Sequence, residues 1–109
     1  MRRDVFQAIA DPVRRDIIEL LAEESLSIYT IAEKFEISRP AISKHLKILK
    51  ECEIISYEKR GRERFCFIKP KNLVPAFLWI EKYQGLWEDK LDSFDTYINK
   101  LKTKRDLNQ

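Results

Sequence analysis

The basic residues of this chain are concentrated in one stretch, and their chemistry suits the binding of phosphate. Residues 39–64 hold eight lysines and arginines against four glutamates, a local charge of +4, whereas the whole chain of 109 residues carries only +3. These basic residues are Arg39, Lys44, Lys47, Lys50, Lys59, Arg60, Arg62 and Arg64. Positive charge clustered in this way is the electrostatic footprint of a surface that binds a polyanion.

Other chemistries have little support in the sequence. The chain has one histidine, two cysteines and two glycines, so no catalytic triad, glycine-rich phosphate loop or metal cluster can be assembled from the usual patterns. We therefore expect no enzyme, no catalytic residue, no metal and no cofactor. Cys52 and Cys66 leave two interpretations open, a buried apolar pair or a redox switch, and nothing in the sequence indicates a lowered thiol pKa.

The first part of the basic stretch lies on a predicted helix-turn-helix over residues 27–53. Apolar residues recur at helical spacing in two runs, and Ser38 can cap the second run while Pro40 falls in its first turn. The second helix has no acidic residue between positions 39 and 50. This pattern is typical of a helix that enters the DNA major groove, with a solvated amphipathic helix as the alternative. Its outward residues are Arg39, Ser43, Lys44, Lys47 and Lys50.

The second part of the stretch lies on a predicted β-hairpin over residues 54–69. Strand-forming residues alternate in part around Gly61, which predicts a turn with a basic tip. If the strands are regular, alternation places Arg60, Arg62 and Arg64 on one side, where they would meet backbone phosphates or the minor groove. The alternative is a tip that only aids solubility.

Helical patterns flank these two elements. Before them we expect a short first helix and a second helix that opens at Asp11-Pro12. After them, residues 73–101 predict one long helix, because apolar residues recur at alternating spacings of four and three and only Gln84 interrupts the series. Gly85 suggests a local bend. We interpret the seam as a dimer contact, with packing into the chain's own core as the alternative. The residues assigned to the contact are Val5, Phe6, Ile9, Phe77, Ile80, Trp87, Leu91, Phe94, Ile98 and Leu101.

Together these patterns predict a single domain over residues 1–109 that is mainly α with a small β-hairpin wing. Its architecture is a winged helix-turn-helix with a long C-terminal dimerisation helix. The chain has no apolar run of about 18 residues that could cross a membrane, and its start lacks the apolar core of a signal peptide. We therefore expect a cytoplasmic protein without a membrane partner.

With these elements in view, the chain resembles the ArsR/SmtB family of bacterial winged-helix repressors. FQAIADPVRRDIIELL is similar to the family's opening helix pair and ISRPAISKHLKILKE to its recognition segment, in order within residues 5–69. The resemblance implies a homodimer that binds a palindromic operator in double-stranded DNA, usually at its own promoter. In the matching pattern the residues that face the groove are Ser38, Arg39, Pro40, Ser43, Lys44 and His45, with Lys47 nearer the edge.

Two departures from the family pattern are visible. Metal-sensing members carry a cysteine motif where residues 27–31 hold no thiol, or histidines on a terminal helix that here has only Asp89, Asp92 and Asp95. The chain therefore resembles a branch without the metal-site motifs. Members also often carry glycine where Glu53 stands, and a left-handed residue there would be strained as glutamate.

Individual roles and the overall function leave alternatives open. Arg39 is the best candidate to read a base, because its guanidinium can bind guanine O6 and N7 together, and a phosphate contact is its alternative. His45 either faces the groove or packs beneath the helix. The function that we expect is a sequence-specific repressor. The alternatives are a winged-helix protein-interaction module and a redox-responsive repressor that uses Cys52 and Cys66.

Overall fold

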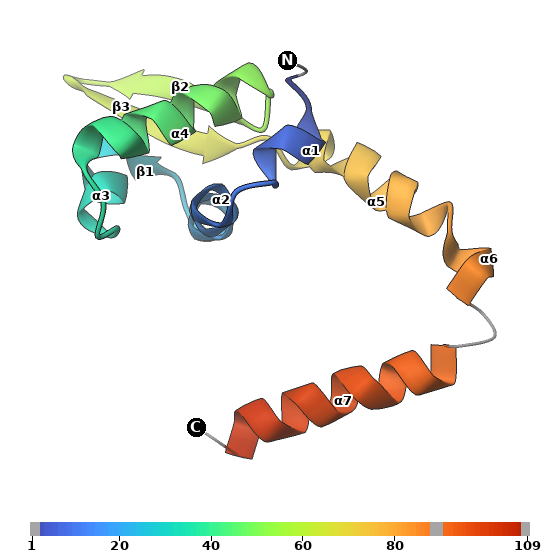
Figure 1. Ribbon diagram of the computed structural model, residues 1–109. Coiled ribbons are helices and arrows are strands. Elements are labelled where there is room, and N and C mark those ends of the chain that lie inside the picture. The colour runs from blue at the N-terminus through green and yellow to red at the C-terminus, as the bar shows by residue number, and fades with distance from the viewer. Residues whose placement is uncertain (1–2, 88–90, 108–109) are drawn as a thin grey trace. The chain divides into compact units, whose positions relative to one another are not determined.

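The computed structural model describes the backbone of residues 3–87 and 91–107, and the side chains of residues 3–86 and 95–104 (Figure 1). Two compact units are present, Met1–Ala76 and Phe77–Gln109, and each is described by itself. The first unit contains α1 (Val5–Ala8), α2 (Pro12–Glu23), β1 (Leu26–Ser27), α3 (Ile28–Glu33), α4 (Arg39–Glu51), β2 (Ile55–Arg60), β3 (Glu63–Ile68) and the 3-10 helix η1 (Pro70–Leu73). Helix α5 (Val74–Glu81) leads into the second unit, which holds α6 (Gln84–Trp87) and α7 (Leu91–Leu107).

The helices of the first unit begin at side-chain caps. The Asp11 carboxylate accepts hydrogen bonds from the backbone N–H groups of Val13 at 2.8 Å and Arg14 at 3.2 Å. The Ser38 hydroxyl accepts one from the Ala41 N–H at 3.3 Å. A proline follows each of these caps in the first helical turn, where it gives up no intrahelical bond. The predicted starts of α2 and α4 are therefore confirmed.

The core lies between α2, α3, α4 and the sheet. The apolar stripe predicted for the helix-turn-helix is confirmed, since Ile31 of α3 and Ile42 of α4 are fully buried. The largest fully buried side chains are Ile17, Ile31, Ile42, Leu46, Leu49, Ile54, Ile55 and Cys66. Figure 1 shows α4 along the hairpin formed by β2 and β3, and α4 contacts both α3 and β2. Burial of one face of α4 leaves its opposite face to solvent.

The wing is the hairpin of β2 and β3, which belongs to a three-stranded antiparallel sheet with the order β1-β3-β2. The predicted hairpin is confirmed, with Lys59 opposite Arg64 and Arg60 opposite Glu63. Gly61 has a φ of 66° in the turn, a conformation that glycine adopts without strain. The short strand β1 pairs with β3 and was not predicted, because two residues are too few to show alternation.

The register corrects the expectation that three arginines share one side of the wing. Directly opposite residues of an antiparallel pair point to the same face. Arg60 therefore shares a face with Glu63, whereas Arg64 shares the other face with Lys59. Arg62 lies in the turn. The two-residue turn between the strands interrupts the alternation that a continuous strand would have had.

The single helix predicted over residues 73–101 is also wrong. The segment forms η1, α5, α6 and α7, and a turn at residues 82–83 separates α5 from α6. There the Tyr83 N–H donates to the Ile80 carbonyl at 3.1 Å, three residues back instead of four, so the α-helical hydrogen-bond pattern ends. The break lies just before Gly85, whose helix propensity is about 1 kcal/mol poorer than that of alanine. Apolar spacing alone had carried no information about the continuity of the helix.

Helix α4 ends in a motif that requires a left-handed residue. The Ile54 N–H bonds to the Leu49 carbonyl at 3.0 Å and the Glu53 N–H to the Lys50 carbonyl at 2.9 Å. This is the pair of bonds of a Schellman motif, and Glu53 at its centre has a φ of 61°. The Asn72 amide also donates to the Glu53 carbonyl at 2.6 Å. The strained geometry anticipated for a glutamate at this position is therefore present.

Replacing Glu53 with glycine is expected to stabilise the protein. The left-handed conformation costs an L-residue about 1–2 kcal/mol, and glycine loses roughly 0.5–1 kcal/mol more backbone entropy on folding. The net gain for Glu53→Gly is therefore expected to reach about 1 kcal/mol, measured as a higher midpoint of urea unfolding at unchanged slope. Glu53→Ala is the control because it removes the same side chain without relieving the strain, and an equal gain from both variants would contradict this explanation.

Candidate nucleic-acid interface

The face of α4 opposite the core carries a row of exposed polar and basic side chains. Its exposed residues are Arg39, Pro40, Ser43, Lys44, Lys47 and Lys50, with Ser38 exposed at the cap. No carboxylate lies among them, because the first acid of the helix is Glu51. The outward face expected from the sequence is therefore present in the structure.

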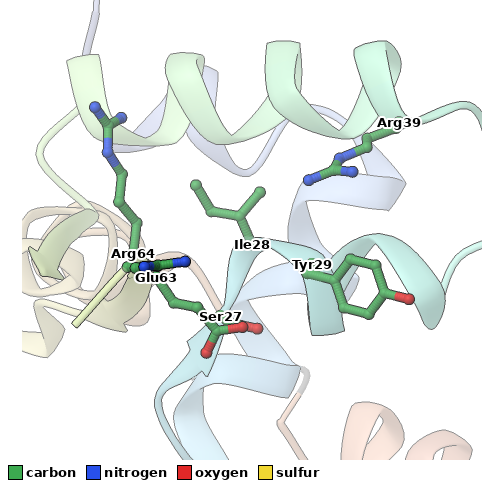
Figure 2. A pocket seen from close by; sticks show the side chains of 7 residues that line it. Ser27, Ile28, Tyr29, Arg39, Glu63 and Arg64 are labelled. Carbon is green, nitrogen blue, oxygen red and sulfur yellow. The ribbon is translucent and has the colours of Figure 1, made fainter. Parts of the chain in front are cut away.

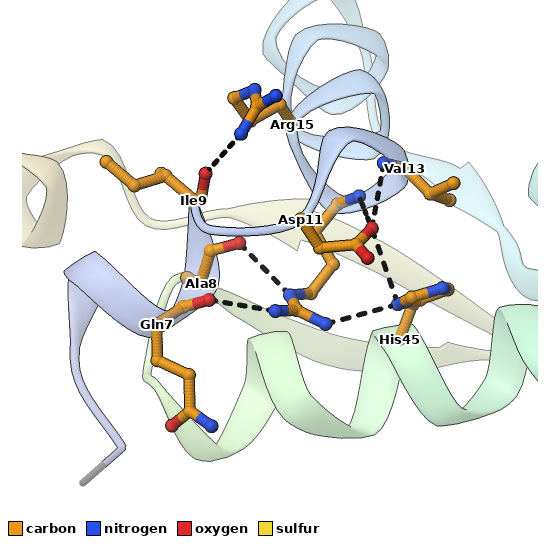
Figure 3. A network of polar contacts seen from close by, with 8 residues as sticks. Gln7, Ala8, Ile9, Asp11, Val13, Arg15 and His45 are labelled. Carbon is orange, nitrogen blue, oxygen red and sulfur yellow. Dashed lines mark hydrogen bonds and ion pairs between the residues drawn. The ribbon is translucent and has the colours of Figure 1, made fainter.

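His45 is placed differently from the other residues of the matching pattern. Its ring lies against the start of α2, with only 19% of the side chain exposed (Figure 3). His45 Nδ1 is 3.3 Å from Arg14 Nη1 and 3.9 Å from Asp11 Oδ1. Of the two interpretations of His45, packing beneath the helix is the one that agrees with the structure, because a position one residue past Lys44 is turned by about 100° toward the core side.

Two adjacent hollows lie between the helices and the wing. The first has a volume of about 380 Å³ and is lined by Ser27, Ile28, Tyr29, Arg39, Arg62, Glu63 and Arg64. The second has about 310 Å³ and is lined by Ile28, Ser43, Leu46, Lys47, Lys50, Tyr57 and Arg64. Ile28 and Arg64 belong to both, and Figure 2 shows Arg39 and Arg64 on either side of Ile28. The basic face of α4 and two arginines of the wing therefore line one shared concave surface, which we call the basic groove.

Aromatic rings hold several of these cations in place. Arg39 Cζ lies 5.8 Å from the centre of the Tyr29 ring. Tyr57 lies between two cations, with Lys50 Nζ at 5.0 Å and Arg64 Cζ at 5.8 Å from its ring centre. Such contacts contribute roughly 0.5–1 kcal/mol at exposed sites and restrict the motion of long side chains. Neither tyrosine was predicted as part of the site, because only the tertiary fold brings the rings to the cations.

Both tyrosines stay neutral over the ordinary pH range. A hydrogen bond from the phenol to Glu33 raises the pKa of Tyr29, with the charge of Glu33 acting in the same direction. Burial raises the pKa of Tyr57. Each phenol therefore keeps its proton near neutral pH, and the groove gains no negative charge from these rings.

Arg60 lies outside the basic groove. Its guanidinium packs 4.8 Å from the centre of the Phe65 ring and forms an ion pair with Glu58 at 3.2 Å. Both partners lie on the face of the hairpin that Arg60 shares with Glu63. Of the arginines expected on the wing, Arg62 and Arg64 thus line the basic groove together with α4.

The two thiols lie in the protein interior. Cys52 and Cys66 are free and buried. Burial raises the pKa of both, to about 11 for Cys66, and the nearby charge of Arg64 offsets only part of that rise. Redox switching depends on an accessible thiolate, so this environment disfavours the redox alternative.

Neither thiol is expected to react with a disulfide reagent in the native protein near neutral pH, whereas both should react after unfolding. Because the fold favours the neutral thiol, Cys66 contributes stability that is lost as the pH rises from its ordinary pKa of 9.0 toward about 11. Thiol titration before and after denaturant measures the first effect, and unfolding midpoints between neutral pH and pH 10–11 measure the second. A native protein that reacts at the unfolded rate would show that one thiol is accessible.

In the part of the chain that the structure describes, no three histidine, cysteine, aspartate or glutamate residues lie together as a metal site. Asp89 and Asp92 fall outside the described side chains, and Asp95 is exposed. Among the described helices none is long and apolar enough to cross a membrane.

The residues assigned to a dimer contact from the first helix fall into different environments. Val5 is only 4% exposed and belongs to the core, which corrects its assignment to an outer seam, because the inner side of α1 closes over the end of the core. Ile9 is partly buried against the same core. Phe6 is 40% exposed.

In the second unit the described members of the predicted seam are largely exposed. Phe77, Ile80 and Leu101 are 65%, 47% and 47% exposed, and Ile98 is partly buried. Trp87, Leu91 and Phe94 lie outside the described side chains. Further exposed apolar residues of this unit are Leu78, Trp79 and Leu86. An apolar surface of this extent is unusual for a soluble monomer.

Comparisons with known proteins agree with this geometry. A family described as bacterial regulatory protein, arsR family, matches residues 11–57. The transcriptional repressor SdpR of Bacillus subtilis is 40% identical over 77 residues, which cover 71% of this chain and 86% of SdpR. The HTH-type transcriptional regulator Rv2034 of Mycobacterium tuberculosis is 38% identical over 94 residues, 86% of this chain and 85% of the relative. The crystal structure of the ArsR family transcriptional regulator RHA00566 has a TM-score of 0.69 at 32% identity, and the similarity covers 76% of this chain and 91% of that chain.

Proposed function

This chain belongs to the arsR family of bacterial regulatory proteins, and on that premise we propose that it acts as a homodimer that represses its own or an adjacent promoter. It is a DNA-binding transcription regulator and not an enzyme. The observation that carries the proposal is the basic groove, in which the outward face of α4 and Arg62 and Arg64 of the wing line one surface. Such a regulator works in the cytoplasm, where bacterial DNA lies.

In the proposed complex, α4 enters the major groove and the wing follows the DNA backbone or the minor groove. The major groove is about 12 Å wide, which admits one α-helix. Arg39 projects from the first turn of α4, the part of a recognition helix that reaches base edges. Ser43 and Lys44 lie about one turn further along, and Lys47 and Lys50 line the second hollow together with Tyr57 and Arg64. Arg62 and Arg64 then meet phosphates beyond the groove edge.

A two-fold dimer would give the operator its symmetry. The exposed side chains of Phe77, Ile80 and Leu101 support a partner of the same kind, because self-association covers an apolar surface that otherwise faces water. Recognition helices related by a two-fold axis contact half-sites about 34 Å apart, one turn of DNA. The operator is then expected to be a palindrome.

The alternatives weighed from the sequence have less support. A module used only for protein interaction has no need of a row of cations over residues 39–50 with no carboxylate among them, with Arg39 beside Tyr29 and Lys50 beside Tyr57. A redox-responsive repressor would need a thiolate, whereas burial raises the pKa of Cys52 and Cys66.

Selection of bound duplexes from random DNA tests the proposed function. The expected result is enrichment of an inverted repeat whose half-sites are centred about one helical turn apart. The same sequence should occur upstream of the chain's own gene or of a neighbouring gene. Retention on heparin without enrichment of any DNA sequence would show that the protein binds polyanions without sequence preference, and would contradict the proposal.

Loss of the Arg39 side chain is expected to relax base preference at one position of each half-site. A bidentate contact between arginine and guanine contributes about 1–3 kcal/mol of discrimination. Competition binding with single-base operator variants measures the preference of Arg39→Ala against that of the wild type. Lys47→Ala is the control, since loss of a phosphate contact lowers the affinity for all DNA sequences about equally. If Arg39→Ala lost equal affinity for operator and random DNA, Arg39 would contact the DNA backbone and not a base.

A further inference from the structure

Arg14 of α2 is a cation held inside the protein. The residue is only 8% exposed, and a buried charge is tolerated when hydrogen bonds satisfy it. Its Nε donates to the Ala8 carbonyl at 3.1 Å and its Nη2 to the Gln7 carbonyl at 2.9 Å. Its Nη1 lies 3.3 Å from His45 Nδ1 on α4 (Figure 3). One side chain thus connects α1, α2 and α4.

The contacts to α1 anchor the guanidinium. The last carbonyls of a helix have no partner within the helix, and the donors of an arginine supply one. Arg15 does the same for the Ile9 carbonyl at 2.6 Å, at the C-cap of α1. Asp11 caps α2 beside them, and although burial acts to raise its pKa, hydrogen bonds from the Arg14 and Val13 backbone N–H groups hold that pKa below the usual value. The bonds to α1 therefore hold the Arg14 guanidinium in a fixed position next to α4.

The contact to His45 constrains the recognition helix. A guanidinium can only donate, so His45 Nδ1 is the acceptor, and a neutral ring then carries its proton on Nε2. Successive residues of an α-helix are turned by about 100° around its axis. A helix that keeps His45 against Arg14 consequently has a set rotation, which fixes the directions of its neighbours Ser43 and Lys44 and of Arg39 on the outer face.

We infer that Arg14 is a positioning residue for DNA recognition, which sets the rotation of α4 through its hydrogen bond to His45. The inference rests on the proposed function, because it concerns how α4 reads the operator. Base contacts depend on orientation to a fraction of an ångström, whereas contacts to phosphates tolerate small rotations. Loss of the Arg14–His45 bond therefore lowers the preference for operator over random DNA more than it lowers the affinity for random DNA.

The test uses the full chain and compares the affinities for the selected operator and for a scrambled duplex of equal length at one salt concentration. Arg14→Gln and His45→Phe are expected to lower the operator-to-scrambled ratio about tenfold or more, within the range of one lost base contact. Affinity for the scrambled duplex should change by no more than about twofold. His45→Asn places an acceptor oxygen near the position of Nδ1 and should recover most of the ratio that His45→Phe loses.

Arg15→Gln is the matched control, because it removes the same charge and a similar bond to α1 without touching α4. The double variant Arg14→Gln/His45→Phe should lower the ratio no further than the more affected single variant, since each single variant already removes the Arg14–His45 bond. The inference is overturned if Arg15→Gln lowers the ratio as much as Arg14→Gln, or if His45→Asn and His45→Phe behave alike. If Arg14→Gln fails to fold, the comparison of His45→Asn with His45→Phe tests the inference by itself.

These outcomes separate the inference from the proposed function. A wild-type ratio near one overturns both, since there would then be no sequence recognition to position. A high wild-type ratio that survives in the folded variants overturns only the role of Arg14. Thermal unfolding of each variant, recorded beside the binding data, shows whether a lost ratio merely follows lost stability.

Discussion

The affinity of the proposed dimer for its operator is expected to fall by about 10³–10⁵-fold between about 50 and 200 mM salt, the loss typical of 6–10 phosphate contacts. The cations that line the basic groove supply these contacts. With Arg39 assigned to a base, they are Lys47, Lys50, Arg62 and Arg64 in each copy of the chain. Binding releases the counterions that DNA had condensed, so added salt opposes association. Titrations at several salt concentrations give the slope directly.

The wing offers a matched pair of variants for this prediction. Arg62→Ala should reduce the salt slope by about two for a dimer, one for each copy, and should weaken all DNA sequences about equally. Arg60→Ala should have a smaller effect, because Arg60 lies on the other face of the hairpin and is paired with Glu58 at 3.2 Å. An affinity that is independent of salt, or an Arg60 effect as large as that of Arg62, would contradict the proposed path of the DNA.

A charge in the apolar surface of α5 is expected to separate the dimer. Phe77 is 65% exposed, so Phe77→Asp should leave the fold of the chain intact while placing an unpaired carboxylate in the proposed interface. Monomers would bind one half-site at a time and lose the gain of linking two sites, roughly 10²–10⁴-fold in affinity. Sedimentation velocity at micromolar concentration and binding to whole and half operators measure the two consequences.

Two controls accompany this variant. Phe77→Leu keeps an apolar side chain at the same position and should remain dimeric. Lys82→Glu changes the charge in the turn after α5 without removing apolar surface, so it reports any purely electrostatic effect. A wild type that sediments as a monomer, or a Phe77→Asp dimer as stable as the wild type, would refute this interface.

The sequence by itself determined the helix-turn-helix, the hairpin and the basic surface that they expose. Asp11 and Ser38 are caps because short polar side chains satisfy free N–H groups at a helix start, a local effect that spacing reveals. Ile31 and Ile42 are buried because helical periodicity places them on one side. That same periodicity turns the cations of α4 outward. Local propensity and period therefore sufficed for the helix-turn-helix and for the hairpin.

Only the tertiary structure decided how side chains from distant positions meet. The two-residue turn put Arg60 and Arg64 on opposite faces, and the packing of α4 on α2 brought His45 to Arg14. Tyr29 reaches Arg39 only because α3 packs against α4. Each of these features depends on register, rotation or packing between elements, and a periodic pattern along one chain does not encode those quantities.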